Sequence, residues 1–393
     1  MLKSTFAKRA ALVAALMLTL LLFAGCVGGP SEVSWGSLSL YGSPQTILFA
    51  FGDRIVMLDP LDGNPIQLRD SSGSARVDDT GNPRLWEVTS PAGAATKFFT
   101  APIPIDDDTL LVVSYDRGIF EVDVPSARIN NPTGYAVNGL VTGHALLADE
   151  LLYVPLSSNS MTARTVNGFG EAWSLTTRQS NWAQPLLIDG VLYLSSLDHT
   201  LYAMDPETGE VLWEAALGGA MTSAPVYADG YLYVGTFGRK LLKLDPQNNG
   251  QIVASYDTHD WVWGSPALVD GTLYFGDVSG WLYAVTDDGD TFTPVWEPVQ
   301  VATRAIIATP VVTDQSIIVG SRDHNLFWVN RETGAVELTR QLAGELLGNM
   351  LLMQPSEEND LSRDLVVVST MNAAEFVVAY SADNGERVWV YSR

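Results

Sequence analysis

The chain has 393 residues, 47% of them hydrophobic, and a formal net charge of −23 at pH 7. So acidic a chain repels nucleic acid and anionic lipid head groups, and we expect neither to be a direct partner. Cys26 is its single cysteine, which excludes a disulfide and a cysteine zinc site.

The first 25 residues have the pattern of a secretory signal. Lys3, Lys8 and Arg9 precede an apolar run over residues 10–23, and small residues then lead to Cys26. The segment resembles a bacterial lipoprotein signal, which implies that Cys26 becomes the lipidated first residue of the mature protein. An uncleaved membrane anchor is the alternative. In both cases we expect the body of the protein outside the cytoplasm, held at a membrane of the cell envelope by its N-terminus, with residues 26–35 as a tether.

From residue 36 onward the sequence predicts β-strands, with no helical period. Residues 47–50 and 55–59 form the first unit, whose outer turn is expanded to about residue 84. Two further units begin near Pro102 and His144.

Four units that follow repeat one pattern most clearly. Pro185, Pro225, Pro266 and Pro310 open them, at spacings of 40, 41 and 44 residues. This is the period of propeller blades. Asp-Gly and Thr-Gly pairs in these units supply the left-handed backbone that tight hairpin turns need.

A last unit ends the chain at residues 365–389, after an acidic insertion at 356–364. The count predicts an all-β fold over residues 36–393: an eight-bladed β-propeller of four-stranded antiparallel blades. Tryptophans recur near the outer strands, and we expect them to be buried between adjacent blades. They are Trp86, Trp173, Trp213, Trp296 and Trp389.

Residues 202–213, Tyr-Ala-Met-Asp-Pro-Glu-Thr-Gly-Glu-Val-Leu-Trp, are similar to the tryptophan-docking repeat of the pyrroloquinoline-quinone propeller superfamily. Within it, the chain resembles the lipoprotein propeller of the bacterial outer-membrane β-barrel assembly machinery. The resemblance implies a non-enzymatic envelope lipoprotein, monomeric, that serves as a scaffold for envelope or membrane proteins. In that lipoprotein an N-terminal strand completes the last blade. Here residues 386–391 already supply the outer strand, so we expect every blade to come from contiguous sequence.

The quinone-dependent dehydrogenases of the same superfamily are the enzyme alternative. Many carry a vicinal disulfide over the cofactor, which a chain with one cysteine cannot form. Motifs for a serine nucleophile, a zinc protease and a phosphate loop are absent from the sequence. The acidic runs at 106–108 and 287–290 fit hairpin turns better than calcium loops. We therefore predict no catalytic residue, no cofactor and no metal site.

Strand order predicts two unlike faces. The inter-blade loops and the second-to-third-strand turns share one face, and the remaining turns share the other. The first face receives all four histidines, and the second receives Asp189, Asp205, Glu207, Asp229, Asp270, Asp287 and Asp288.

We interpret the first face as the partner-binding surface, because aromatic and arginine side chains dominate interface energetics. The candidate residues are Trp182, Trp261, Trp263, His144, His259, Arg304, Arg239 and Lys240. Two local explanations stay open. His199 and His324 can occupy left-handed turn positions, and Trp182 and Trp263 can pack at the channel rim. A further alternative is that this face binds envelope glycans.

Overall fold

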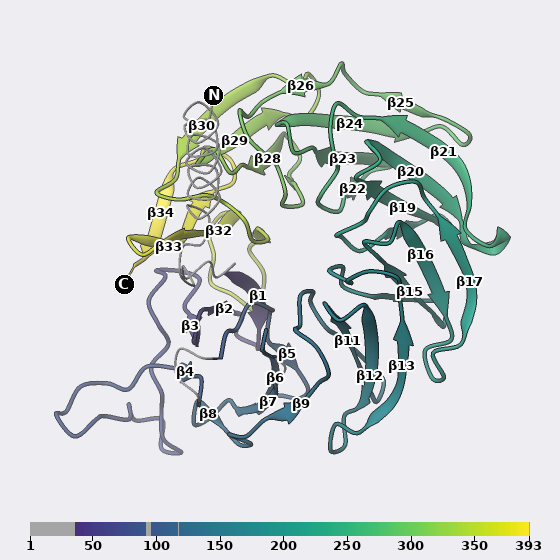
Figure 1. Ribbon diagram of the computed structural model, residues 1–393. Coiled ribbons are helices and arrows are strands. Elements are labelled where there is room, and N and C mark those ends of the chain that lie inside the picture. The colour runs from purple at the N-terminus through teal and green to yellow at the C-terminus, as the bar shows by residue number, and fades with distance from the viewer. Residues whose placement is uncertain (1–35, 92–95, 117, 393) are drawn as a thin grey trace, which may run out of the picture. The chain divides into compact units, whose positions relative to one another are not determined.

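The computed structural model describes residues 36–91, 96–116 and 118–392. These residues form eight antiparallel sheets that follow one another along the chain. The sheets are the blades of a ring, and their colours run in chain order around it (Figure 1). The predicted eight-bladed β-propeller is thus confirmed. The predicted signal peptide and Cys26 lie outside the described residues.

The strands of each blade run from the axis of the ring outward (Figure 1). Blades 1 to 4 contain β1 (Ser37–Tyr41), β2 (Thr46–Phe51), β3 (Arg54–Leu58) and β4 (Glu87–Thr89); β5 (Ile103–Pro104), β6 (Thr109–Val113), β7 (Gly118–Asp123), β8 (Arg128–Ile129) and β9 (Tyr135–Ala136); β10 (Leu146–Ala148), β11 (Leu151–Leu156), β12 (Ser160–Thr165) and β13 (Glu171–Thr176); β14 (Leu186–Ile188), β15 (Val191–Ser195), β16 (Thr200–Met204) and β17 (Val211–Ala216).

Blades 5 to 8 contain β18 (Val226–Ala228), β19 (Tyr231–Thr236), β20 (Lys240–Asp245) and β21 (Gln251–Asp257); β22 (Ala267–Val269), β23 (Thr272–Gly276), β24 (Trp281–Asp287), β25 (Phe292–Pro294) and β26 (Val299–Gln300); β27 (Val311–Val312), β28 (Ser316–Gly320), β29 (Asn325–Asn330) and β30 (Val336–Gln341); β31 (Leu351–Met353), β32 (Leu365–Asn372), β33 (Glu375–Ser381) and β34 (Arg387–Tyr391). In blades 2 and 6 two short strands replace the single outer strand that the repeat predicts.

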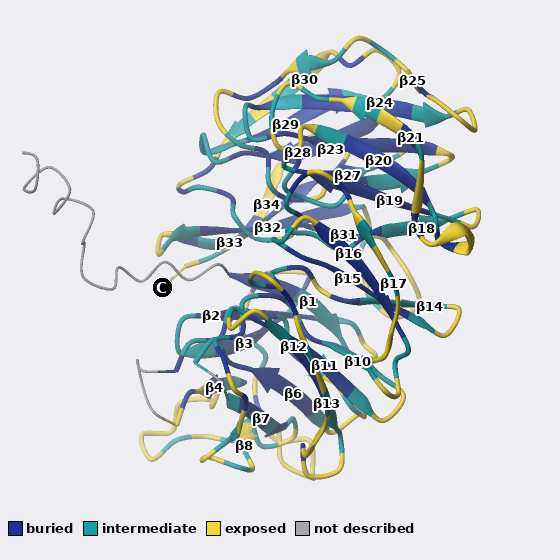
Figure 2. Cartoon of the chain, turned by 45° about the vertical axis from the view of Figure 1, so that its right-hand side comes forward, coloured by how far each residue is buried: buried dark blue, intermediate teal, exposed yellow. Residues whose placement is uncertain are grey.

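The two middle strands of each blade are the most buried, and exposure rises toward the outer strands and turns (Figure 2). Side chains from neighbouring blades form shared apolar clusters. Tyr153 and Met161 of blade 3, for example, pack in one cluster with Leu192 and Tyr202 of blade 4. Each blade is therefore covered by the next, which a single sheet with two apolar faces requires.

The tight turns have the backbone that the Asp-Gly pairs predict. Asp189 and Gly190 both have positive φ, at 51° and 75°, and Asp229 and Gly230 repeat this at 51° and 84°. Two consecutive left-handed residues define the type I′ turn, whose twist matches that of the flanking strands.

Tryptophans join neighbouring blades as predicted, but of the five only Trp86 and Trp389 are buried, and the other three are half-buried. In four blades the indole N–H donates to a carbonyl in the third-to-fourth-strand turn of the following blade: Trp86 to Val124 (2.7 Å), Trp173 to Pro206 (2.9 Å), Trp296 to Arg331 (3.2 Å) and Trp389 to Pro60 (2.8 Å). Trp213 lies over Gly250 in the same way, because a Cβ at that glycine would be 2.5 Å from the indole. Burying one indole stabilises the fold by at most about 4–6 kcal/mol.

Two blades make the same joint with a different residue. In blade 7 the indole is that of Trp328, which comes from the third strand and donates to the carbonyl of Ala382 at 2.7 Å. In blade 5 the joint is a lysine: Lys243 Nζ donates to the carbonyl of Gly289 at 2.9 Å and lies 2.7 Å from Asp287. The repeat pattern did not predict either residue, because each lies on the third strand and not on the outer one.

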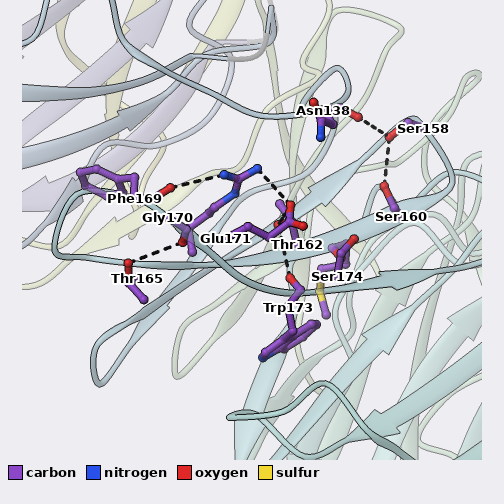
Figure 3. A network of polar contacts seen from close by, with 12 residues as sticks. Asn138, Ser158, Ser160, Thr162, Thr165, Phe169, Gly170, Glu171, Trp173 and Ser174 are labelled. Atoms are coloured by element: carbon purple, nitrogen blue, oxygen red, sulfur yellow. Dashed lines mark hydrogen bonds and ion pairs between the residues drawn. The ribbon is translucent and has the colours of Figure 1, made fainter.

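In five blades the register between the third and fourth strands shifts at a β-bulge, at the pairs Ala163/Arg164, Ala203/Met204, Lys243/Leu244, Trp328/Val329 and Ala379/Tyr380. In blades 3, 4 and 8 the extra residue of the outer strand comes directly before the docking tryptophan. Figure 3 shows the polar contacts around the bulge of blade 3. Glu171 accepts from Arg164 and from Thr162, both at 3.2 Å, and Thr162 also contacts the carbonyl of Trp173. In blades 3, 4 and 8 the extra residue changes the direction of the outer strand just before the tryptophan whose indole contacts the next blade.

The ring closes between the two ends of the described chain. β1 pairs only within blade 1, so every blade consists of contiguous sequence, as predicted. Asn349 of the last inter-blade loop bonds to both the N–H and the carbonyl of Leu38, at 3.1 and 2.8 Å. Together with the Trp389–Pro60 bond, these contacts hold blade 8 against blade 1.

Candidate partner-binding face

Backbone hydrogen bonds tie each inter-blade loop to the second-to-third-strand turn next to it. Phe237 N–H donates to the carbonyl of Ala220 at 2.9 Å, and Val278 N–H donates to that of Trp261 at 3.0 Å. Loops and turns of this kind make up what we call the inter-blade face. The first-to-second and third-to-fourth-strand turns make up the opposite one, the turn face.

Four aromatic side chains from three loops meet on the inter-blade face. The rings of Phe237 and Trp261 are parallel, with centroids 4.8 Å apart, and Phe237 also contacts Trp263 at 5.2 Å. Trp263 in turn lies 6.1 Å from Trp182. We call Trp182, Phe237, Trp261 and Trp263 the aromatic cluster. Trp261 is its most accessible member, with 44% of its surface exposed.

The local sequence explains how the cluster forms. Val262 is fully buried, and its N–H donates to the carbonyl of Thr236, so the flanking Trp261 and Trp263 are held outside the core. The Thr222 hydroxyl donates to the carbonyl of Trp263 at 2.8 Å and helps to fix that part of the loop. The structure thus brings together the three tryptophans that the sequence proposed.

The sequence reasoning missed Phe237. It lies in the second-to-third-strand turn of blade 5, where the corresponding residue of blade 4 is Leu197. An apolar residue at the tip of a turn in two successive units is the signal that could have identified it.

His259 is fixed beside the cluster by two contacts. Its ring stacks on Trp281 with centroids 3.8 Å apart, and its Nδ1 lies 2.9 Å from the hydroxyl of Tyr283. That hydroxyl donates to the buried Asp277 at 2.7 Å, and burial raises its pKa, so it keeps its proton. A hydroxyl has one proton, so toward His259 it accepts; Nδ1 therefore carries the hydrogen.

The remaining histidines serve the fold locally. His144 Nδ1 accepts a hydrogen bond from the N–H of Ala101 at 3.2 Å, and burial lowers the pKa of the imidazole. His144 is therefore neutral and joins two loops. His199 and His324 have φ values of 71° and 68°, which confirms the left-handed turn explanation for both.

The candidate cations each have an acidic neighbour. Arg239 lies 3.8 Å from Asp260, and Lys240 forms an ion pair with Asp257. The pairing extends to Arg304 and Arg322, which both bond to Glu345, at 2.6 and 2.8 Å. Burial works to raise the pKa of Glu345, but the hydrogen bonds from Arg322 and Arg304 outweigh it and hold the pKa below its usual value. The cations of this face are thus partly neutralised by neighbouring carboxylates.

Within the described residues, no three His, Cys, Asp or Glu side chains are grouped so that they could hold a metal ion. The same part of the chain has no helix that is both long and apolar enough to span a membrane.

Solved structures of the same fold have low sequence identity to this chain. BamB from Moraxella catarrhalis is 15% identical, with a TM-score of 0.63, and the match covers 87% of this chain and 92% of that one. The computationally designed Ika8 protein is 14% identical (TM-score 0.62; 88% and 96% covered), and Sqt1 from Saccharomyces cerevisiae is 11% identical (TM-score 0.65; 86% and 95% covered). So wide a range of proteins shows the fold and not the function.

No curated protein matches the chain. A family model does match: the model described as outer membrane protein assembly factor BamB aligns with residues 169–391, from the end of blade 3 to the last strand. Since this match spans more than half of the sequence, the chain belongs to the family of the outer membrane protein assembly factor BamB.

Proposed function

We propose that the protein is a non-catalytic lipoprotein of the cell envelope whose propeller binds other proteins through the inter-blade face, in the assembly of outer-membrane proteins. Residues 1–25 are its signal peptide, Cys26 is its lipidated residue and residues 26–35 are the tether. The aromatic cluster is the observation that carries the binding role. The family name supports the assembly role.

The cluster has the composition of a protein-interface centre. Its four rings form a contiguous apolar surface, and the paired charges of Arg239, Lys240 and Arg304 lie on loops and turns of the same face. Interfaces typically combine an aromatic centre, where truncation costs most, with a polar rim that contributes little affinity. Trp261 is therefore the residue on which partner affinity should depend most.

Affinity purification of the solubilised protein from its native envelope tests this proposal. Trp261→Ala should reduce capture of the co-purifying membrane protein about 30-fold or more, since an interface tryptophan contributes roughly 2 kcal/mol. Leu212→Ala is the matched control, because Leu212 is also large, apolar and 52% exposed but lies on an outer strand. Equal capture by both variants, with unchanged thermal stability, would rule out the cluster as the binding centre.

A further inference from the structure

The described chain begins on the inter-blade face. Gly36 precedes β1, and its carbonyl accepts a hydrogen bond from Ser369 Oγ at 3.1 Å. Ser369 lies near the end of β32, next to the turn over residues 372–375, which belongs to the inter-blade face. β1 then runs away from this face, because residues 42–45, which connect it to β2, form a first-to-second-strand turn of the turn face. The described chain therefore begins, at Gly36, on the same face as the aromatic cluster.

The tether is short compared with the depth of the propeller. Gly36 is ten positions after Cys26 in the sequence, and an extended chain of that length reaches at most about 35 Å. Blade strands of 5 to 8 residues span about 17–27 Å between the two faces. If the turn face pointed to the membrane, most of the tether would be used to pass along the full depth of a blade.

The charges of the two faces favour the same orientation. The turn face exposes Asp189, Glu207, Asp229 and Asp288, and such a surface is repelled by anionic lipid head groups. On the inter-blade face cations and carboxylates occur together, as in the group of Arg304, Arg322 and Glu345, which has two cations and one carboxylate. The inter-blade face can thus approach a bilayer at a smaller electrostatic cost.

We infer that the anchored protein presents its inter-blade face to the membrane and its acidic turn face away from it. This inference rests on the proposed lipid anchor at Cys26. It specifies the partner further: a protein held by the aromatic cluster approaches from the membrane side and lies within about 35 Å of the bilayer, as the membrane-proximal domain of a membrane protein does.

Fluorescence energy transfer tests the orientation, and the sequence makes it practical. Cys26 is the only cysteine, so in the acylated protein an engineered cysteine is the only free thiol. Ala373→Cys and Asp383→Cys form a matched pair, since both residues are exposed turn positions of blade 8 on opposite faces. Gln179→Cys and Glu207→Cys form a second pair on the opposite part of the ring.

Each full-length variant is labelled, inserted into phosphatidylcholine vesicles that contain an acceptor lipid, and compared within its pair. We expect more transfer from positions 373 and 179 than from 383 and 207. Equal or reversed energy transfer in vesicle-bound protein would contradict the proposed orientation but would leave the proposed lipid anchor supported. The anchor itself is checked in the same experiment, with Cys26→Ser as the unanchored control. If the protein fails to float with the vesicles, as this control should, and if the dye also labels Cys26, then both the lipid anchor and the orientation are contradicted.

Discussion

Trp389 and Pro60 are 329 residues apart in the chain, and a 2.8 Å hydrogen bond from the indole N–H to the proline carbonyl joins them. The same bond recurs between Trp173 and Pro206, only 33 residues apart, inside the ring. The propeller therefore closes with the joint that links its consecutive blades, and closure needs no strand borrowed from the other end of the chain.

Removal of this joint should open the ring. Trp389 is buried, so Trp389→Ala should lower the free energy of unfolding by about 3–5 kcal/mol. Chemical denaturation followed by fluorescence measures the change. Val390→Ala, at the exposed neighbouring position, should stay within about 0.5 kcal/mol of the wild type. A Trp389→Ala protein as stable as the Val390→Ala protein would show that the joint does not hold the ring together.

Alanine substitutions at two glycines distinguish the steric effect of the Trp389 indole on stability from the effect of backbone strain. Gly63 and Gly73 both have positive φ, at 71° and 84°, but a Cβ at Gly63 would be 2.4 Å from Trp389, whereas nothing lies within 4 Å at Gly73. Alanine at either site costs about 1–2 kcal/mol for the left-handed backbone. Gly63→Ala should lose clearly more in thermal unfolding, because the indole must move. Equal losses would mean that the indole is not held against this turn.

The lysine joint of blade 5 makes part of the stability depend on pH. Burial works to raise the pKa of Asp287, but the bonds from Lys243 and Tyr233 outweigh it and lower the pKa below its ordinary value. A carboxyl with a lowered folded-state pKa stabilises the fold above its unfolded pKa, about 3.9, and loses that contribution as the pH falls through the folded value.

Asp287→Asn should therefore be less stable than the wild type near pH 7 and show a shallower loss of stability on acidification. Denaturation midpoints between about pH 3 and pH 7 measure both effects. Asp288→Asn, at the exposed adjacent position, is the control. Parallel profiles for Asp287→Asn and the wild type would contradict the assignment.

Rim charges should act on the rate of association. Lys240→Glu replaces a cation beside the cluster and leaves Asp257 without its ion pair, so an acidic partner should associate more slowly, most clearly at low salt. Surface plasmon resonance at two ionic strengths measures this effect. Asp205→Asn, on the turn face, should leave association unchanged. If only the Asp205 variant slows binding, the partner binds the turn face instead.

The anchor has its own test. Cys26→Ser should move the protein from the membrane fraction to the soluble fraction, since no other cysteine can carry a lipid. Cell fractionation followed by immunoblotting measures the distribution. Retention of the variant at the wild-type level would contradict lipidation and favour an uncleaved membrane anchor.

The sequence by itself determined the architecture. The period of Pro185, Pro225 and Pro266 and the Asp-Gly turns give the number and order of the strands, because each blade is built from local hairpins. Loop order also assigned Trp182 and Trp261 to one face, since alternation of strand direction is a property of the chain alone. The joints at Trp173 and Trp389 were also predictable, because both tryptophans occupy the same position of the sequence repeat.

Only the tertiary structure decided which side chains meet. Trp182 and Trp263 belong to loops 81 residues apart, and their ring centroids lie 6.1 Å from each other in the folded ring. Lys243 replaces an indole because the turn of blade 6 offers it a carbonyl and the carboxylate of Asp287, which no repeat could show. The pairing of Arg304 with Glu345 likewise joins different loops and offsets a positive charge that loop order alone assigned to this face. Contacts of this kind depend on distances across the ring, and a linear pattern does not contain those distances.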